Sequence, residues 1–320
     1  MRRPDARTTD AAPGRARAPV AGAVPRARPC RPADRRPTRA GTALLVRAHD
    51  APGPTLVVPL DRVPGGPLGL GSELARLPAG YRKIALYGDD GAGGLRYRFV
   101  QRLPDGGFDF RAGCGHSLLA CVVAEGRPGP VTVRALTTGD TVLCEPEPPG
   151  RDAYTLHFLR PPDAPGTLPT GRPRDRLLGV PVSLVSYGNP YVFVDARHVR
   201  APAEAHLLAL RAEAARLLGH PPDSALPKIA AVEATAAGLS VRALTVGGWH
   251  PRLAVTGAAA LGAAGALEGT VVPRVEGAVR TPGGTVTVSA RPDRVSVHHK
   301  RATVLGARPL PGRWRVHATA

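Results

Sequence analysis

The feature that most constrains the fold is an apolar segment that follows a glycine-flanked cysteine. Cys114 lies between Gly113 and Gly115, and residues 118–124 carry no charged or strongly polar side chain before the chain reaches Gly126. About three helical turns of this composition predict a helix buried on every side, with the glycine as its C-terminal stop. A helix of this kind needs a sheet wrapped around it.

The same pattern recurs later in the chain without a cysteine. Val255, Thr256 and Gly257 lead into a small, apolar run at 258–267 that stops at Gly269. We therefore expect an α+β fold of two similar domains, each a curved sheet around a central apolar helix. The first turn of a helix binds anions through its free N–H groups and its dipole. Two such helices pointing at one cleft could hold a dicarboxylate from both ends.

The positive charge of the chain is concentrated at its start. The 320 residues carry a formal charge of +18, and residues 1–37 hold ten Arg against three Asp with almost no large apolar side chains. We expect this segment to be a disordered tail. Its presence has two equally good explanations: a start codon assigned too far upstream, or a function of the tail itself. The remainder has no dense basic patch interleaved with aromatics, so no nucleic-acid partner is expected.

Amino-acid usage is skewed in the way that is typical of a GC-rich genome. The chain has 40 Arg but only three Lys, a single Asn and two Ile. Residues of the rare types therefore stand out as candidates for a specific role, and these are Lys83, Lys228, Lys300 and Asn189. Much of the net charge is then compositional and indicates no binding partner.

The cysteines predict a reducing compartment. Cys30, Cys114, Cys121 and Cys144 show neither metal-ligand spacing nor a dense disulfide framework. We therefore expect a cytoplasmic protein without a bound metal. No apolar run is long enough to cross a bilayer, so no membrane partner is expected either.

Local patterns predict further elements and the domain limits. We expect a short helix at 73–77 capped by Ser72, an amphipathic helix at 203–218, and strands at 271–279 and 295–305. The domains are expected at 38–178 and 179–304, with a C-terminal strand at about 305–320 completing the first domain.

Short motifs stand in a fixed order over 38–310. They lie at 39–42, 83–85, 113–115, 166–171, 182–185 with 188–194, 227–230 and 250–258. In this order they resemble the family of 2-methylaconitate cis–trans isomerases and 4-oxalomesaconate tautomerases, which has the diaminopimelate-epimerase-like fold. The most specific motifs are the Gly-Asn-Pro corner at 188–190 and the run at 250–258.

This resemblance implies a cofactor-free isomerase that moves a proton and a double bond on an unsaturated di- or tricarboxylate. The catalytic lysine of the family falls on Lys83 and its active-site cysteine on Cys114, on opposite sides of the bound substrate. The family's substrate-binding turns fall on Arg39, Gly41, Thr42, Gly115, His116, Ser117, Asn189, Thr256, Gly257 and Ala258.

Departures from the family pattern leave the substrate open. Ala40 and Ala43 replace a glycine and a serine of the first motif, and His116 gives the Cys-Gly-His of proline racemases. One alternative is therefore an amino-acid racemase or epimerase of the same fold. It would need a second thiol, which the segment 255–257 lacks. The other alternative is a catalytically inactive carboxylate-binding protein.

Several candidate residues also have a purely structural interpretation. Cys114 could be a buried structural thiol, His116 a helix-capping residue, and Asn189 a residue that only tolerates a left-handed turn. Cys121 is expected in the core, and residues 298–300 are interpreted as a solvated strand end. The sequence leaves the oligomeric state open, with a homodimer as one arrangement.

Overall fold

The computed structural model describes residues 42–61, 70–149, 152–221, 224–236, 238–245 and 248–310. The expected tail, the segment 311–320, Cys30, and the site candidates Arg39 and Gly41 lie outside the described residues. Among the described residues, no helix is both long and apolar enough to span a membrane.

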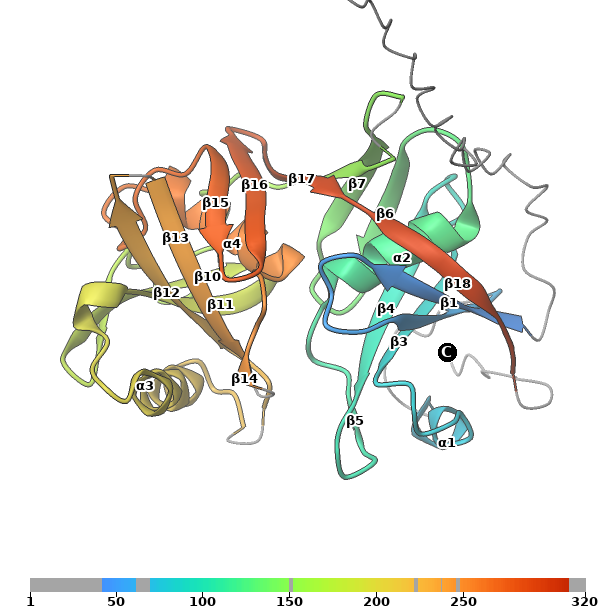
Figure 1. The fold of residues 1–320 in the computed structure, drawn as a ribbon, viewed down its shortest axis with the longest axis horizontal. Coiled ribbons are helices and arrows are strands. Elements are labelled where there is room, and N and C mark those ends of the chain that lie inside the picture. Colours follow the sequence, from blue (N-terminus) through green and yellow to red (C-terminus); the bar gives the residue numbers. More distant parts are fainter. Residues whose placement is uncertain are drawn as a thin grey trace, which may run out of the picture. The chain divides into compact units, whose positions relative to one another are not determined.

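The described chain is an α+β protein in which strands greatly outnumber helices (Figure 1). Up to residue 158 its elements are β1 (Thr42–Ala48), β2 (Thr55–Pro59), α1 (Leu70–Ala75), β3 (Lys83–Asp89), β4 (Leu95–Arg102), β5 (Phe108–Asp109), α2 (Gly115–Glu125), β6 (Val131–Ala135), β7 (Thr141–Pro146) and β8 (Tyr154–Phe158). They continue with β9 (Asp175–Leu177), β10 (Val180–Tyr187), β11 (Asn189–Asp195), a 3₁₀ helix (Ala196–His198), α3 (Ala203–Leu217), β12 (Lys228–Thr235), β13 (Gly238–Thr245), β14 (Gly248–Trp249), α4 (Val255–Ala266), β15 (Gly277–Thr281), β16 (Gly284–Arg291), β17 (Arg294–Lys300) and β18 (Ala302–Pro309).

Strand pairing follows the same pattern twice along the chain. β1–β2 is antiparallel, β2–β3 parallel, β3–β4 antiparallel, β4–β6 parallel, and β6–β7 and β7–β8 antiparallel. β10–β11, β11–β12, β12–β13, β13–β15, β15–β16 and β16–β17 repeat this order of directions. We call β18 with β1–β8 the first repeat and β9–β17 the second repeat, because β18 pairs with β1 as β9 pairs with β10.

Each repeat encloses one apolar helix. α2 contacts β1, β2, β3, β4, β6 and β18, and α4 contacts β10, β11, β16 and β17 (Figure 1). Cys121 in the middle of α2 is fully buried, which confirms its expected place in the core. Gly126 ends α2 in the left-handed conformation, with φ of 69°, and its N–H donates to the carbonyl of Val122. The small residues of both helices allow the strands to pack closely around them.

The outer face of each sheet carries a second helix. Leu70 and Leu74 of α1 belong to an apolar cluster with Leu56 and Ile84 of the first repeat. The amphipathic helix expected at 203–218 is α3, whose buried leucines pack against the outer face of β10–β12. Alternate strand residues therefore face α2 or α4 on the inside and α1 or α3 on the outside.

Three expected elements are wrong in detail. Residues 271–276 form a turn rather than a strand, because the Thr270 hydroxyl is hydrogen-bonded to the carbonyls on both sides of the bend. The strand expected at 295–305 divides into β17, which pairs with β16 and β8, and β18, which pairs with β1, and His299 at the junction has a φ of 58°. Ser72 lies inside α1 rather than before it.

Candidate active site

Cys114 lies immediately before the first residue of α2 on a turn that is held from three sides. Its carbonyl accepts a hydrogen bond from the Tyr97 hydroxyl at 2.9 Å and from the first-turn amide of Leu118 at 3.0 Å. A Cβ at Gly113 would lie 2.7 Å from Thr138 Cγ2, so only glycine fits there. The thiol is free and partly exposed, so it is accessible to a ligand.

Asn189 joins the cysteine turn to the second repeat. Its side chain is fully buried, accepts from the Gly113 amide at 2.7 Å and donates to the Gly113 carbonyl at 2.8 Å. Its Nδ2 also donates to Thr256 Oγ1 in the first turn of α4, at 3.2 Å. The left-handed residue of this hairpin is Gly188, with φ of 74°. Asn189 therefore connects the N-terminal ends of the two buried helices.

The first turn of α2 contains two polar side chains with different surroundings. Ser117 is fully buried and its hydroxyl lies 2.9 Å from Thr55 Oγ1 on β2, so this contact holds the helix against the sheet. His116 is only 3% exposed, and its Nε2 makes no hydrogen bond to the part of the chain that the structure describes. A buried polar atom without a partner is costly, which makes His116 a candidate ligand contact.

The first turn of α4 lies directly against that of α2. A Cβ at Gly115 would lie 2.5 Å from Val255 Cγ1, and one at Gly257 would lie 2.5 Å from the Tyr191 hydroxyl. Ala254 precedes α4 where Cys114 precedes α2. The position equivalent to the thiol thus carries a methyl group in the second repeat.

Lys83 is directed toward α2 by its place in the strand. It is the first residue of β3, where Ala85 and Tyr87 belong to the cluster around α2 while Ile84 and Leu86 belong to the cluster on the α1 face. Side chains two residues apart share a face, so Lys83 shares the inner face. It is partly buried without being sealed from solvent, and its charge acts on His116 in the first turn of α2.

Lys300 is the third lysine near these helices. Residues 298–300 were expected to be a solvated strand end, and this prediction is wrong for Lys300, which is buried. Lys300 is 4% exposed, and its Nζ donates to Asp50 Oδ2 at 2.8 Å. Arg252 pairs with the other oxygen of Asp50 at 3.1 Å. The three residues contribute to a basic pocket of about 290 Å³.

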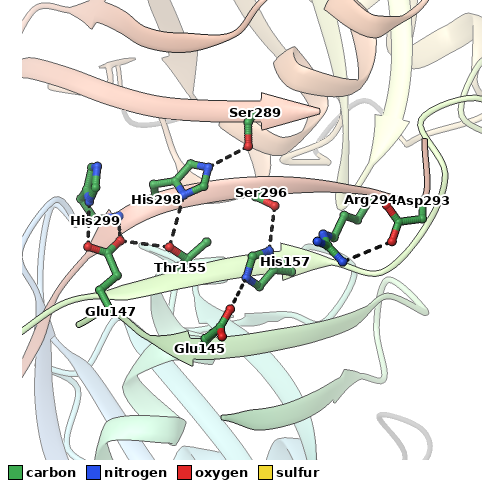
Figure 2. A network of polar contacts seen from close by, with 10 residues as sticks. All are labelled: Glu145, Glu147, Thr155, His157, Ser289, Asp293, Arg294, Ser296, His298 and His299. Atoms are coloured by element: carbon green, nitrogen blue, oxygen red, sulfur yellow. Dashed lines mark hydrogen bonds and ion pairs between the residues drawn. The ribbon is translucent and has the colours of Figure 1, made fainter. Parts of the chain in front are cut away.

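The neighbouring histidines cross-link the two repeats (Figure 2). His298 on β17 lies within hydrogen-bonding distance of Thr155 on β8 and of Ser289 on β16, at 3.2 and 2.8 Å. The His299 ring lies 2.8 Å from Glu147. These contacts accompany the antiparallel pairing of β8 with β17. They give this segment a structural role at the seam between the repeats.

The charges of all three lysines act on His116. Burial lowers the pKa of His116 well below its ordinary value, and the charges of Lys300, Lys83, His250 and Lys228 lower it further. Burial likewise lowers the pKa of His250 to about 4. Both imidazoles are therefore neutral at pH 7, while the lysines supply the positive potential around the helix N-termini.

Comparison with known proteins yields the fold. No family model matches the chain, and no curated protein sequence matches it. Among solved structures, methylitaconate-delta-isomerase matches 87% of this chain and 98% of its own, with 19% identity and a TM-score of 0.58. A hydroxyproline epimerase from Agrobacterium vitis matches 85% and 92%, with 16% identity and a TM-score of 0.56.

A probable proline racemase from Agrobacterium radiobacter K84 matches 85% of this chain and 93% of its own, with 16% identity and a TM-score of 0.53. The chain has the diaminopimelate-epimerase-like fold. This is the fold that the sequence motifs implied, and the repeated strand pairing around α2 and α4 is its architecture in this chain.

The structure brings most of the candidate residues to the two helix N-termini. Gly115, His116 and Ser117 form the first turn of α2, while Thr256, Gly257 and Ala258 lie in that of α4. Thr42 is the first residue of β1 and is partly buried, and no described contact ties it to this group. His250, which opens the motif at 250–258, was given no definite role from the sequence.

Proposed function

We propose that this chain is an isomerase that moves a proton, and with it a double bond, on an unsaturated di- or tricarboxylate. The observation that carries the proposal is a partly exposed thiol at the meeting point of two helix N-termini, two residues before a buried histidine on which the charges of all three lysines of the chain act. Methylitaconate-delta-isomerase, by its name, shifts a double bond in a dicarboxylate and has the same fold.

The chemistry needs a base, an acid and stabilisation of the intermediate. Removing a proton next to a conjugated carboxylate places negative charge on its oxygens, which helix N-termini and lysine cations stabilise. In the proposed reaction Lys83 and Cys114 form the acid–base pair: one of them takes the allylic proton, the double bond shifts, and the other gives a proton to the far carbon. The proton gained by the first then returns to the second through solvent, which completes the cycle.

The second repeat argues against a two-thiol racemase. Proton transfer on both faces of one carbon needs two acid–base groups opposite each other, and neither Ala254 nor the segment 255–257 supplies a second thiol. The hydroxyproline epimerase and the probable proline racemase share the fold. Hydroxyproline and proline are therefore included in the assay below, as compounds on which we expect no proton exchange.

The proposal is tested by proton exchange in deuterated water. The purified chain is incubated with methylitaconate, methylaconitate, aconitate and oxalomesaconate, and with proline and hydroxyproline, while NMR follows the loss of allylic and Cα proton signals. We expect exchange on at least one unsaturated acid and none on the amino acids. Exchange on an amino acid alone, or on no compound, would contradict the proposal.

Matched variants separate chemistry from folding. Lys83→Ala and Cys114→Ala should each lower kcat roughly 10²- to 10⁴-fold, the usual contribution of general acid–base groups. Arg82→Ala removes the exposed cation beside Lys83, and Cys121→Ala removes the buried thiol of the same helix. Neither control should change kcat more than a few-fold.

A further inference from the structure

Lys228 occupies the position in the second repeat that Lys83 occupies in the first. Each is the first residue of a strand, β12 or β3, that pairs in parallel with the preceding strand of its repeat. Each is followed by Ile and Ala, and these two isoleucines are the only ones in the chain. The internal repeat therefore places two lysines symmetrically about the two buried helices.

The strand geometry directs Lys228 toward α4. Ala230 and Val232 share its strand face and belong to the cluster around α4, while Ile229 belongs to the cluster on the α3 face. Lys228 is the register partner of Tyr191, whose hydroxyl lies against Gly257 in the first turn of α4. Lys228 thus begins its strand beside the N-terminus of α4.

The charge of Lys228 interacts electrostatically with the residues of the candidate site. Burial lowers the pKa of Lys228, Cys114 acts in the opposite direction, and the charge of Lys83 lowers it again. The same charge helps to lower the pKa values of His116 and His250. Lys228 is therefore within electrostatic reach of the thiol, of His116 in the first turn of α2 and of the second lysine.

The side-chain amino groups of Lys83 and Lys228 make no hydrogen bond or ion pair with any residue that the structure describes. Lys300, in contrast, is paired with Asp50. Asp109, which also acts on Lys228, is already bonded by Arg111. Two partly buried ammonium groups that act on each other, with no described carboxylate paired to either, repel one another and are poorly solvated, so their placement is costly unless an anion joins them.

We infer that Lys228 binds a second carboxylate of the substrate, so that Lys83 and Lys228 together select molecules with at least two carboxylates. The inference rests on the proposed function and deepens it by assigning the specificity for dianions to a residue of the second repeat. The unpartnered Nε2 of the buried His116 supplies an uncharged hydrogen-bonding position in the first turn of α2. A monocarboxylate would leave one of the two lysines unpaired.

Binding of saturated acids tests this inference without any turnover. Isothermal titration calorimetry measures the affinity of the full chain for propane-1,2,3-tricarboxylate and succinate, with butyrate as the monocarboxylate of matched length. We expect wild-type protein to bind the first two more tightly than butyrate. Lys228→Met should weaken them roughly 10- to 100-fold, the usual effect of losing one charged hydrogen bond, and should change butyrate binding less than three-fold.

Two variants keep the result interpretable. Lys228→Arg keeps the cation and should retain most of the affinity, and Arg47→Met removes an exposed charge of the first repeat and should change nothing. Lys228→Met removes a desolvated charge, so its melting temperature should equal or exceed that of wild type. Equal losses for succinate and butyrate, an unchanged affinity for both, or no binding of any acid to wild-type protein would overturn the inference.

The same experiment separates the inference from the proposed function. If the wild-type protein isomerises a substrate in the NMR assay and Lys228→Met binds succinate as tightly as wild type, the proposed function is supported and the role of Lys228 is refuted. Charge-selective binding without isomerisation would support Lys228 as a carboxylate ligand and refute the isomerase.

Discussion

Asn189, the only asparagine in the chain, holds the cysteine turn and the first turn of α4 in place through its side-chain hydrogen bonds. One buried amide satisfies both the N–H and the C=O of Gly113 and reaches Thr256 on the other helix. A carboxylate could not donate to Gly113, and a longer side chain would not fit between two backbones. This explains why an asparagine remains at this position in a chain of such skewed composition.

Replacing Asn189 should therefore destabilise the protein. Asn189→Ala leaves the Gly113 N–H and C=O buried without partners, at about 1–3 kcal/mol for each group, so we expect a loss of about 2–4 kcal/mol in unfolding free energy. Urea denaturation measures it. Gln101→Ala, which removes a less buried amide that also bonds to backbone carbonyls, should cost less than 1 kcal/mol. Equal costs for the two variants would contradict the special role of Asn189.

The residue types of the site could be predicted from sequence because the chemistry leaves a local signature. A thiol between two glycines before an apolar helix is visible in the chain itself, and the lysines stand out against 40 arginines. Their convergence was not predictable, since it depends on pairing between strands that are far apart in sequence. Lys300 illustrates this: it stands out in the composition as Lys83 does, but it is paired with Asp50.

At the scale of elements, the close approach of α2 and α4 is fixed by a glycine. A side chain at Gly115 would overlap Val255, so Gly115→Ala must push the two N-termini apart. We expect a loss of about 1–3 kcal/mol in stability, the usual cost of overpacking, together with reduced affinity for succinate. Urea denaturation and calorimetry measure the two effects.

Compensation by Val255 would identify steric overlap as the cause. Val255→Gly opens the space, so the double variant Gly115→Ala/Val255→Gly should be more stable than the sum of the single changes predicts. Gly71→Ala in α1, where a Cβ meets no atom within 4 Å, is the matched control and should leave stability equal or slightly higher. Strict additivity in the double variant would rule out the proposed contact.

Elements with a strong local pattern were predicted correctly, and those that depend on partners were not. α2 and α3 follow from composition and periodicity alone. β2 was missed because its apolar run is only five residues long, and its identity as a strand comes from pairing with β1 and β3. Residues 295–305 were predicted as one strand because apolar residues alternate with polar ones in both halves of the segment. The break at Arg301 is set by the different partner strands of β17 and β18.

At the scale of the whole molecule, buried neutral histidines predict sensitivity to acid. The folded chain depresses the pKa values of His116, His250 and His298, in each case mainly through burial. The unfolded chain binds protons on these residues near pH 6.5, whereas the folded chain does so only at lower pH. Protons therefore favour the unfolded state as the pH falls from about 6.5 toward 4, and stability declines over this window.

His250 allows a quantitative test of that decline. With a folded pKa of about 4 against an ordinary value of 6.5, it should contribute a loss of about 3 kcal/mol between pH 7 and pH 4. Urea denaturation at pH 7, 6, 5 and 4 should show this slope, and His250→Gln should flatten it by about that amount. Because His250, Lys83 and Lys228 share one electrostatic environment, a dianion that neutralises the lysines should also raise the folded pKa of His250 and so reduce the acid sensitivity. An acid profile that is the same with and without saturating succinate would show that the lysines and the histidine do not share a ligand site.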